Sequence, residues 1–188
     1  KFKLNKHTSI CGPSGSGKTT LLQNIIGISN FSNSKVYFNL KLLNDNGDLQ
    51  VGYVPQKNKL FSGTIRENIL LRRERFNNKS ISDIDLRIWE CLKITKLDDI
   101  ITSLPKKLET TFDTSSTFLS GGQIQRLAIS RAILMQPKIL LMDEATSSLD
   151  SIIESEILDN LNELGITIIS IAHRDSAIRK SDYQVFIK

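Results

Sequence analysis

The sequence predicts an α/β protein in which a parallel β-sheet is covered by helices and interrupted by a mostly helical insertion. Two observations predict this class. Apolar segments of strand length alternate with segments of helix length at both ends of the chain, an order typical of parallel sheets. Residues 63–136 have mostly helical patterns instead. The 188 residues are the length of one domain, so we expect a core of residues 1–62 and 137–188 and a helical subdomain of residues 63–136.

Each predicted element follows from its local pattern. Apolar residues recur at spacings of three and four from Ile81 to Leu92, as on one face of a helix. Pro137 ends a later helix, and Ser151 with Glu154 forms a capping box at the start of another. The predicted strands cover residues 8–11, 35–40, 50–54, 138–142, 166–171 and 185–187, and the predicted helices cover residues 18–27, 80–96, 120–135 and 151–164.

The composition is that of an ordinary globular protein, with 39% apolar and 24% charged residues. The longest apolar runs, such as residues 139–142, have four residues, whereas a membrane-spanning helix needs about 20. No long apolar segment follows the basic N-terminal residues, so no signal peptide is predicted. The net charge of +5 comes from scattered residues, which indicates a solvated surface and no nucleic-acid partner.

Three side chains with reactive chemistry lie outside any motif. Cys11 and Cys91 match no metal or redox spacing, and we expect two buried free thiols, although the sequence leaves a disulfide open. His7 has no motif around it and is expected at the surface.

A glycine-rich loop is the first motif that carries chemistry. Residues 12–19, Gly-Pro-Ser-Gly-Ser-Gly-Lys-Thr, fit the phosphate-binding pattern G-x-x-x-x-G-K-[ST]. Glycines let backbone N–H groups approach phosphate oxygens, the following helix adds its positive end, and the lysine adds a charge. The alternative is a Gly/Ser loop without a ligand. The candidate ATP-binding residues are Gly12, Ser14, Gly15, Ser16, Gly17, Lys18, Thr19 and Thr20, with the Thr19 hydroxyl also a candidate Mg²⁺ ligand.

Two carboxylates follow the apolar run of residues 139–142. Asp143 is expected at the C-terminal edge of the sheet, where the phosphate loop also lies, and can hold the Mg²⁺ shell. Glu144 can orient or deprotonate a water that attacks the γ-phosphate. A strand that simply ends in an acidic turn is the alternative, and the nearby phosphate loop disfavours it.

Residues 119–123, Leu-Ser-Gly-Gly-Gln, form the third motif. Ser120 and Gln123 match a capping box, so a well-capped helix is one interpretation. However, Gly121 and Gly122 cost a helix about 1 kcal/mol each relative to Ala. Bare backbone at a helix N-terminus makes sense if N–H groups must approach an anion closely.

These motifs, in this order, resemble those of the nucleotide-binding domain of ABC transporters, and residues 119–123 are identical to that family's signature sequence. The resemblance implies a P-loop NTPase, RecA-like core with an inserted helical signature subdomain. It also implies that Gln56 lies near Mg²⁺ and the attacking water, that Asp150 lies at a dimer interface, and that His173 contacts the γ-phosphate. Without the resemblance, Gln56 would be interpreted as a loop residue, Asp150 as a helix N-cap and His173 as a packed or capping histidine.

The resemblance implies two partners. A second nucleotide-binding domain would pair head to tail, so that Ser120, Gly121, Gly122, Gln123 and Asp150 face ATP bound to the other copy. Residues 60–69 resemble the segment that lies under a transmembrane domain in exporters, on the cytoplasmic face of a membrane. The usual acidic, Gly-containing stretch before the signature is replaced in residues 111–118, and Ser148 stands where Ala is common.

The resemblance also bears on the extent of the chain and on its activity. The adenine-stacking aromatic of the family normally lies farther upstream than the eleven residues before the phosphate loop, and the chain stops soon after His173, so we expect a chain truncated at both ends. The favoured function is ATP hydrolysis that powers export, with Glu144, His173 and Gln56 as catalytic residues and Thr19, Gln56 and Asp143 at the metal. A soluble cassette acting on ribosomes or nucleic acid, and a module that binds ATP without turnover, remain alternatives. The transported substrate is not encoded here.

Overall fold

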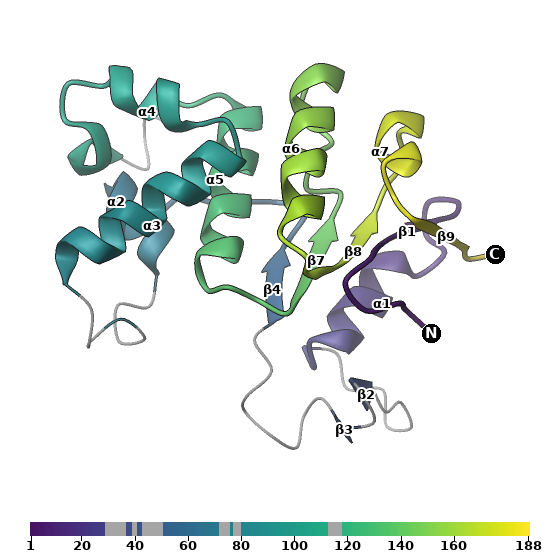
Figure 1. Cartoon of the computed structure of the whole chain (residues 1–188). Helices are drawn as coiled ribbons and strands as arrows, with labels where there is room; N and C mark the ends of the chain where they lie inside the picture. Colours follow the sequence, from purple (N-terminus) through teal and green to yellow (C-terminus); the bar gives the residue numbers. More distant parts are fainter. Residues whose placement is uncertain (29–36, 39–40, 43–50, 72–75, 77–79, 113–117) are drawn as a thin grey trace.

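The chain folds around one five-stranded sheet in which every neighbouring pair of strands is parallel (Figure 1). The computed structural model describes residues 1–28, 37–38, 41–42, 51–71, 76, 80–112 and 118–188. In spatial order the strands are β4 (Val51–Val54), β7 (Ile139–Asp143), β8 (Thr167–Ile171), β1 (His7–Cys11) and β9 (Tyr183–Phe186). The predicted α/β class with a parallel sheet is therefore confirmed.

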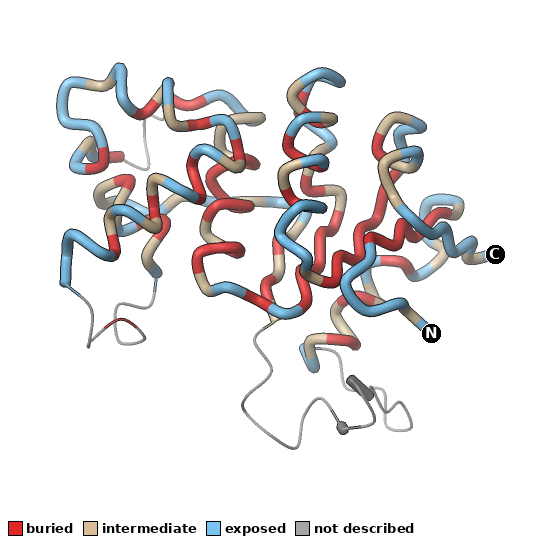
Figure 2. Tube along the Cα trace, in the orientation of Figure 1, coloured by how far each residue is buried: buried red, intermediate tan, exposed pale blue. Residues whose placement is uncertain are grey.

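The central strands are buried along their whole length. Every residue of β1, β7 and β8 is buried (Figure 2). Parallel strands with both faces covered have continuous apolar sequences instead of alternating ones, which explains why the run in residues 139–142 has no polar interruption. Each fully buried Leu or Ile side chain contributes about 1.5–3 kcal/mol.

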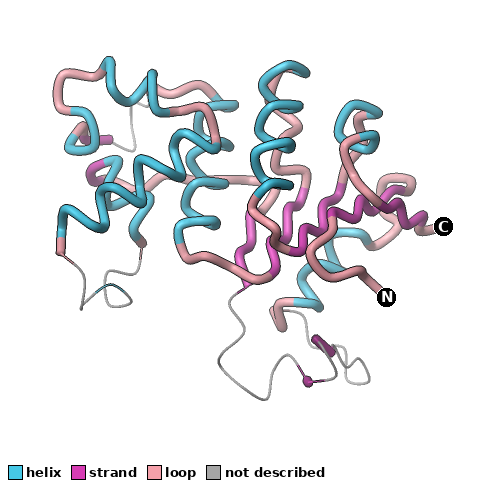
Figure 3. Tube along the Cα trace, in the orientation of Figure 1, coloured by secondary structure: helices cyan, strands magenta, loops and turns pink. Residues whose placement is uncertain are grey.

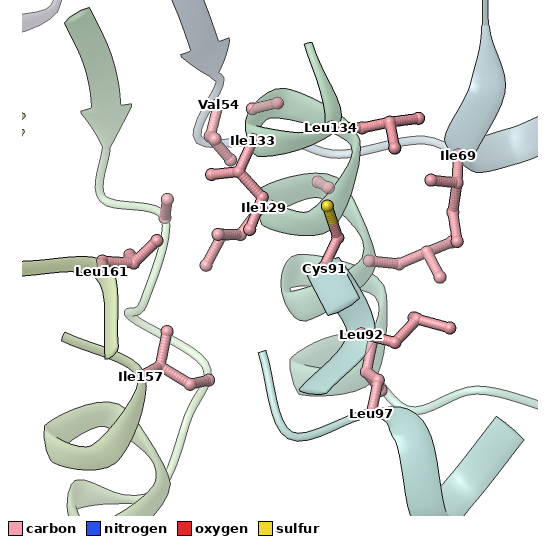
Figure 4. Packing of buried hydrophobic residues seen from close by; sticks show 14 of the residues in the cluster. Val54, Ile69, Cys91, Leu92, Leu97, Ile129, Ile133, Leu134, Ile157 and Leu161 are labelled. Atoms are coloured by element: carbon pink, nitrogen blue, oxygen red, sulfur yellow. The ribbon is translucent and has the colours of Figure 1, made fainter. Parts of the chain in front are cut away.

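Different helices cover the two faces of the sheet. Strand pleating sends successive side chains of β7 to opposite faces, so Leu140 and Leu141 belong to separate apolar clusters. The cluster of Leu141 includes side chains of α1 (Lys18–Ile25). The cluster of Leu140 includes side chains of α5 (Gly121–Leu134) and α6 (Ser151–Glu163), which Figure 4 shows in part.

A mostly helical segment separates β4 from β7 in the chain and lies to one side of the sheet (Figure 3). α2 and α3 both pack against α5. Besides α5, the segment contains β5 (Gly63–Thr64), α2 (Ile65–Leu70), α3 (Ile81–Ile94), α4 (Asp98–Ser103), the 3₁₀ helix η2 (Lys107–Glu109) and β6 (Thr111–Phe112), which pairs antiparallel with β5. The division into a core and a subdomain of residues 63–136 stays a prediction.

Most predicted elements occur within three residues of their expected ends. The predicted helix over residues 18–27 ends at Ile25, and the predicted last strand over residues 185–187 is β9, which begins at Tyr183. The predicted strand over residues 35–40 lies largely outside the described residues. The short strands β2 (Tyr37–Phe38) and β3 (Lys41–Leu42) pair antiparallel there, and residues 113–117 are also outside the described part.

The predicted capping box of Ser151 and Glu154 is wrong. Asp150 is the N-cap of α6, and its carboxylate accepts hydrogen bonds from the N–H groups of Ile152 (3.1 Å) and Ile153 (2.9 Å). Ser151 is already the first helical residue. Glu154 is buried and accepts a hydrogen bond from Ser176 Oγ of α7 (Asp175–Arg179) at 2.7 Å. A carboxylate that satisfies two free N–H groups at the correct position leaves the serine no capping role.

Both cysteines are buried free thiols, as predicted. Burial raises the pKa of Cys91 to about 12 and also raises the pKa of Cys11. No described helix has the length and apolar character needed to span a membrane.

The expectation that His7 lies at the surface is wrong. His7 begins β1, which lies between β8 and β9, and its side chain is only 1% exposed. Its Nε2 and Ser170 Oγ are 2.8 Å apart, and Ser9 Oγ lies 3.2 Å from the same hydroxyl. The sequence could not reveal this position because the polar partner comes from a strand about 160 residues away.

We predict that His7 makes the fold sensitive to acid. Burial lowers the pKa of His7 from 6.5 to about 4, so the unfolded chain binds this proton first as the pH falls. The contribution of His7 to stability is complete above pH 6.5 and is lost as the pH falls to about 4, a loss of about 3 kcal/mol. Urea unfolding at pH 7 and pH 4.5 should show this loss, and His7→Gln should reduce it. An unchanged pH dependence in the variant would contradict the prediction.

Candidate ATP-binding and catalytic site

The predicted site residues follow the carboxyl ends of four neighbouring parallel strands. The glycine-rich loop of residues 12–17 follows β1, Gln56 follows β4, Glu144 follows β7 and His173 follows β8. Parallel strands bring their carboxyl ends to one edge of a sheet, which is where α/β proteins bind ligands. Residues far apart in the sequence are therefore brought to one edge.

The loop has the backbone conformation that its glycines permit. Gly15 (φ 81°) and Gly17 (φ 87°) lie in the left-handed region, where residues with a side chain are strained. Gly17 is also the N-cap of α1, so the loop leads directly to a helix N-terminus. Free N–H groups and the positive end of the helix dipole favour an anion at this place.

Two polar groups of the loop fit a phosphate ligand. Lys18 is only 6% exposed, and its ammonium donates to the carbonyl oxygens of Gly12 (2.9 Å) and Pro13 (2.7 Å). Among the described residues no carboxylate lies within ion-pair distance of this ammonium, and the buried Ser16 hydroxyl has no hydrogen-bond partner. A buried cation and an unsatisfied hydroxyl would both gain stability from anionic oxygens.

Asp143 and Thr19 form an oxygen pair suited to Mg²⁺. The Thr19 hydroxyl donates to Asp143 Oδ1 at 3.1 Å. The pKa of Asp143 is raised, mainly by burial and also by the negative charge of Glu144. Hydrogen bonds from Thr19 and Tyr53 and the charge of Lys18 act in the opposite direction. Mg²⁺ prefers oxygen ligands, uses one or two carboxylates and takes further ligands from phosphates and water, so this pair fits the ion.

The sequence analysis missed Tyr53. Its side chain makes a hydrogen bond with Asp143, and burial and that carboxylate raise the pKa of the phenol. Tyr53 precedes Val54 in β4, so a strand pattern alone placed it only within a half-buried strand. Its proximity to Asp143 depends on the pairing of β4 with β7, in which Tyr53 lies opposite Leu141.

Glu144 contacts both other predicted catalytic residues. Gln56 Nε2 donates to Glu144 Oε2 at 2.8 Å, and His173 Nε2 lies 2.9 Å from Glu144 Oε1. Glu144 has a φ of 51°, a left-handed backbone that is uncommon for a residue with a long side chain. Strained backbone of this kind concentrates at functional sites, because the surrounding structure must hold it. The structure therefore brings Gln56, Glu144 and His173 together.

The Leu-Ser-Gly-Gly-Gln motif forms the capping box that its sequence predicts. Ser120 Oγ accepts from Gln123 N (3.3 Å), and Gln123 Oε1 accepts from Ser120 N (2.8 Å). A Cβ at Gly121 would have no described residue within 4 Å, whereas a Cβ at Gly122 would lie 3.0 Å from Ser148 O. Gly122 is thus required for close packing within the chain, and Gly121 is not.

The helix that follows the phosphate loop and the helix that begins at this motif lie on opposite faces of the sheet. α1 follows the loop and packs on one face, whereas α5, which begins at the motif, packs on the other. Asp150 caps α6, on the same face as α5. The anion-binding role of Ser120 and Gly121, and the interface role of Asp150, remain predictions.

The site and the sheet define a class: an α/β domain with a phosphate-binding loop and a carboxylate held at the neighbouring strand end. Comparison with known proteins supplies the family. The ABC transporter family pattern matches residues 1–147. The chain belongs to the ABC transporter family and has the fold of its nucleotide-binding domain.

Named relatives and a solved structure agree with this assignment. A putative export ATP-binding/permease protein of Rickettsia prowazekii is 38% identical over 193 residues, covering 100% of this chain and 32% of the relative. The ATP-dependent permease MDL1 of Candida albicans is 38% identical, covering 96% and 27%. A bacterial Atm1-family ABC exporter with ATP bound has a TM-score of 0.87 at 30% identity, covering 100% of this chain and 32% of that one. The chain thus spans about a third of these relatives, and the similarity is to exporters, as predicted.

Proposed function

We propose that this chain is the ATP-hydrolysing domain of an exporter. The observation that carries the proposal is the contact of Glu144 with both Gln56 and His173. Glu144 directly follows Asp143, which pairs with Thr19, and it lies on the same edge of the sheet as the phosphate loop. A domain that only held ATP would not need a carboxylate positioned by two polar side chains. The relatives named export ATP-binding/permease proteins support the coupling of hydrolysis to export.

Each residue has a role in this proposal. Lys18 and the loop amides bind the phosphates, and the Asp143–Thr19 pair, with Gln56 nearby, would hold Mg²⁺, which neutralises phosphate charge when bound. Glu144 accepts a proton from the attacking water while Gln56 and His173 orient its carboxylate. His173 also contacts the γ-phosphate, which it can reach because it lies on the same strand edge as the loop.

We further propose that a second nucleotide-binding domain completes each site, head to tail. Two observations support this pairing. α5 packs on the face of the sheet opposite α1, so an anion bound at the N-terminus of α5 would come from another molecule. Gly121 is exposed, and among the described residues no atom lies within 4 Å of a Cβ placed there, so packing within the described part of the chain gives no reason for a glycine at this position.

Replacing Gly121 with Val tests this pairing. We expect the variant to fold as the wild type does, because a Cβ at Gly121 has no neighbour within 4 Å in the described part of the chain. We expect its kcat for ATP hydrolysis to fall by about tenfold or more, because the side chain would separate the helix N-terminus from the γ-phosphate of the partner site. Phosphate release and thermal unfolding measure the two effects. Full activity in this variant would mean that residues 119–123 only cap a helix.

A groove in the helical segment supports a membrane-domain partner. A cavity of about 570 Å³ opens between α2 and the start of α3, and Phe61, Leu71 and Ile81 lie in its lining with 40%, 55% and 62% of their surfaces exposed. Such apolar exposure is typical of an interaction site. We propose that a cytoplasmic segment of a transmembrane domain docks there, with the chain on the cytoplasmic face of the membrane and residues 63–136 acting as the subdomain that carries the groove.

A further inference from the structure

The loop between β7 and α6 is held by a side chain of α5. Gln125 is 6% exposed, and its Oε1 accepts from Ser148 N at 2.9 Å while its Nε2 donates to Ser147 Oγ at 3.2 Å. Gly122 allows the α5 backbone to approach the same loop, since a Cβ there would lie 3.0 Å from Ser148 O. One side of the loop is therefore fixed to the helix that begins at the signature.

The other side of this loop is held by Arg174. Its Nη1 donates to the carbonyl oxygen of Leu149, and its Nη2 donates to the carbonyl oxygen of Ser147 at 2.7 Å. The planar guanidinium reaches two carbonyl groups at once, which a lysine ammonium on a flexible stem reproduces poorly. Arg174 directly follows His173, so His173 and the loop are joined through one side chain.

These contacts form a closed ring of which Glu144 is a member. Ser147 N donates to Glu144 O at 3.1 Å, Ser147 O accepts from Arg174, and His173 Nε2 returns to Glu144 Oε1 at 2.9 Å. A second link lies beyond the ring, where Ser176 Oγ donates to the buried carboxylate of Glu154 at 2.7 Å. The segment that carries His173 is thus attached to the loop and to α6 at two points.

We propose that Arg174 is a positioning residue that ties His173 to the loop of residues 147–150, so that His173 is aligned with Glu144 when this loop is seated. The proposal rests on the proposed ATP hydrolysis. Gln125 holds the same loop from α5, the helix that begins at the signature. A displacement of α5 would therefore be transmitted to His173 through the loop and the Arg174 guanidinium. Arg174 itself need not contact the nucleotide for this role.

The test uses the full gene product and compares Arg174→Ala and Arg174→Lys with Arg179→Ala, a control at the last arginine of α7, the helix that Arg174 precedes. We expect Arg174→Ala to lower kcat for ATP hydrolysis by about tenfold or more, because small misplacements of catalytic groups have large effects. The KM for ATP should stay within about twofold, since the contacts of Arg174 are with the loop. The kcat of Arg174→Lys should lie between those of the wild type and Arg174→Ala, and the kcat of Arg179→Ala should match that of the wild type.

Chemical rescue separates positioning from folding. Guanidinium chloride at millimolar concentration should restore kcat of Arg174→Ala in a saturable manner, whereas tetramethylammonium chloride at equal ionic strength should not. An unchanged kcat in Arg174→Ala overturns the inference. So does a loss of kcat that follows a lower melting temperature and is not rescued. A wild-type protein that binds no ATP would instead reject the proposed function, so the two failures are distinguishable.

Discussion

Glu144→Gln is expected to lower kcat for ATP hydrolysis by about 100- to 10,000-fold, the usual contribution of a positioned general base. The amide has the shape of the carboxylate and can remain between Gln56 and His173, which contact Glu144 at 2.8 and 2.9 Å. It cannot accept the proton of the attacking water. ATP binding should be retained, because the phosphate loop and the Asp143–Thr19 pair are unchanged. Phosphate release and equilibrium binding of a fluorescent ATP analogue measure the two quantities.

The matched control for this variant is Glu163→Gln. Glu163 is an exposed glutamate at the end of α6, so the same chemical change there should leave kcat unaltered. Hydrolysis by Glu144→Gln at the wild-type rate would reject Glu144 as the base and would favour a site that binds ATP for another purpose.

Lys18→Met is expected to weaken ATP binding by about 10- to 100-fold, because hydrogen bonds to charged groups contribute about 1.5–3 kcal/mol. Methionine keeps an unbranched apolar stem in a position that is 6% exposed, so packing of the loop should be largely preserved. The ammonium now donates to Gly12 O and Pro13 O, and phosphate oxygens are stronger acceptors for it. Titration of the variant with a fluorescent ATP analogue measures the loss.

Lys107→Met in η2 provides the control for charge alone, since Lys107 is an exposed lysine on the helical segment. It should bind ATP as the wild type does. If Lys18→Met also bound with wild-type affinity, the glycine-rich loop would not be the phosphate site, and the proposed function would lose its basis.

Local chemistry in the sequence was sufficient to predict the five strands of the parallel sheet and the four longest helices, whereas the short helices α2, α4 and α7 and the short strands β5 and β6 were not predicted. Ser120 and Gln123 form their capping box because both partners lie within one helical turn. The predicted helix over residues 151–164 ends next to Gly165, whose φ of 65° is a conformation that glycine tolerates. The apolar run before Asp143 predicted a buried strand because only a strand covered on both faces accommodates it.

Contacts between distant strands could not be predicted in the same way. The burial of His7 depends on Ser170, and the contact of Tyr53 with Asp143 depends on strand pairing. Each outcome depends on which side chains the folded sheet places within contact distance of each other. Periodicity and motif spacing contain no information about that choice.

The sequence by itself determined the phosphate loop, the acidic strand end and the signature motif, because each is a short run whose chemistry depends on neighbouring residues. Tertiary structure alone decided that Gln56 and His173 meet at Glu144, and that Arg174 reaches the loop beside it. The physical reason is the parallel sheet. Its pairing brings the ends of β4, β7 and β8 to one edge, so that Gln56, 88 residues before Glu144, and His173 both come within hydrogen-bond distance of that carboxylate.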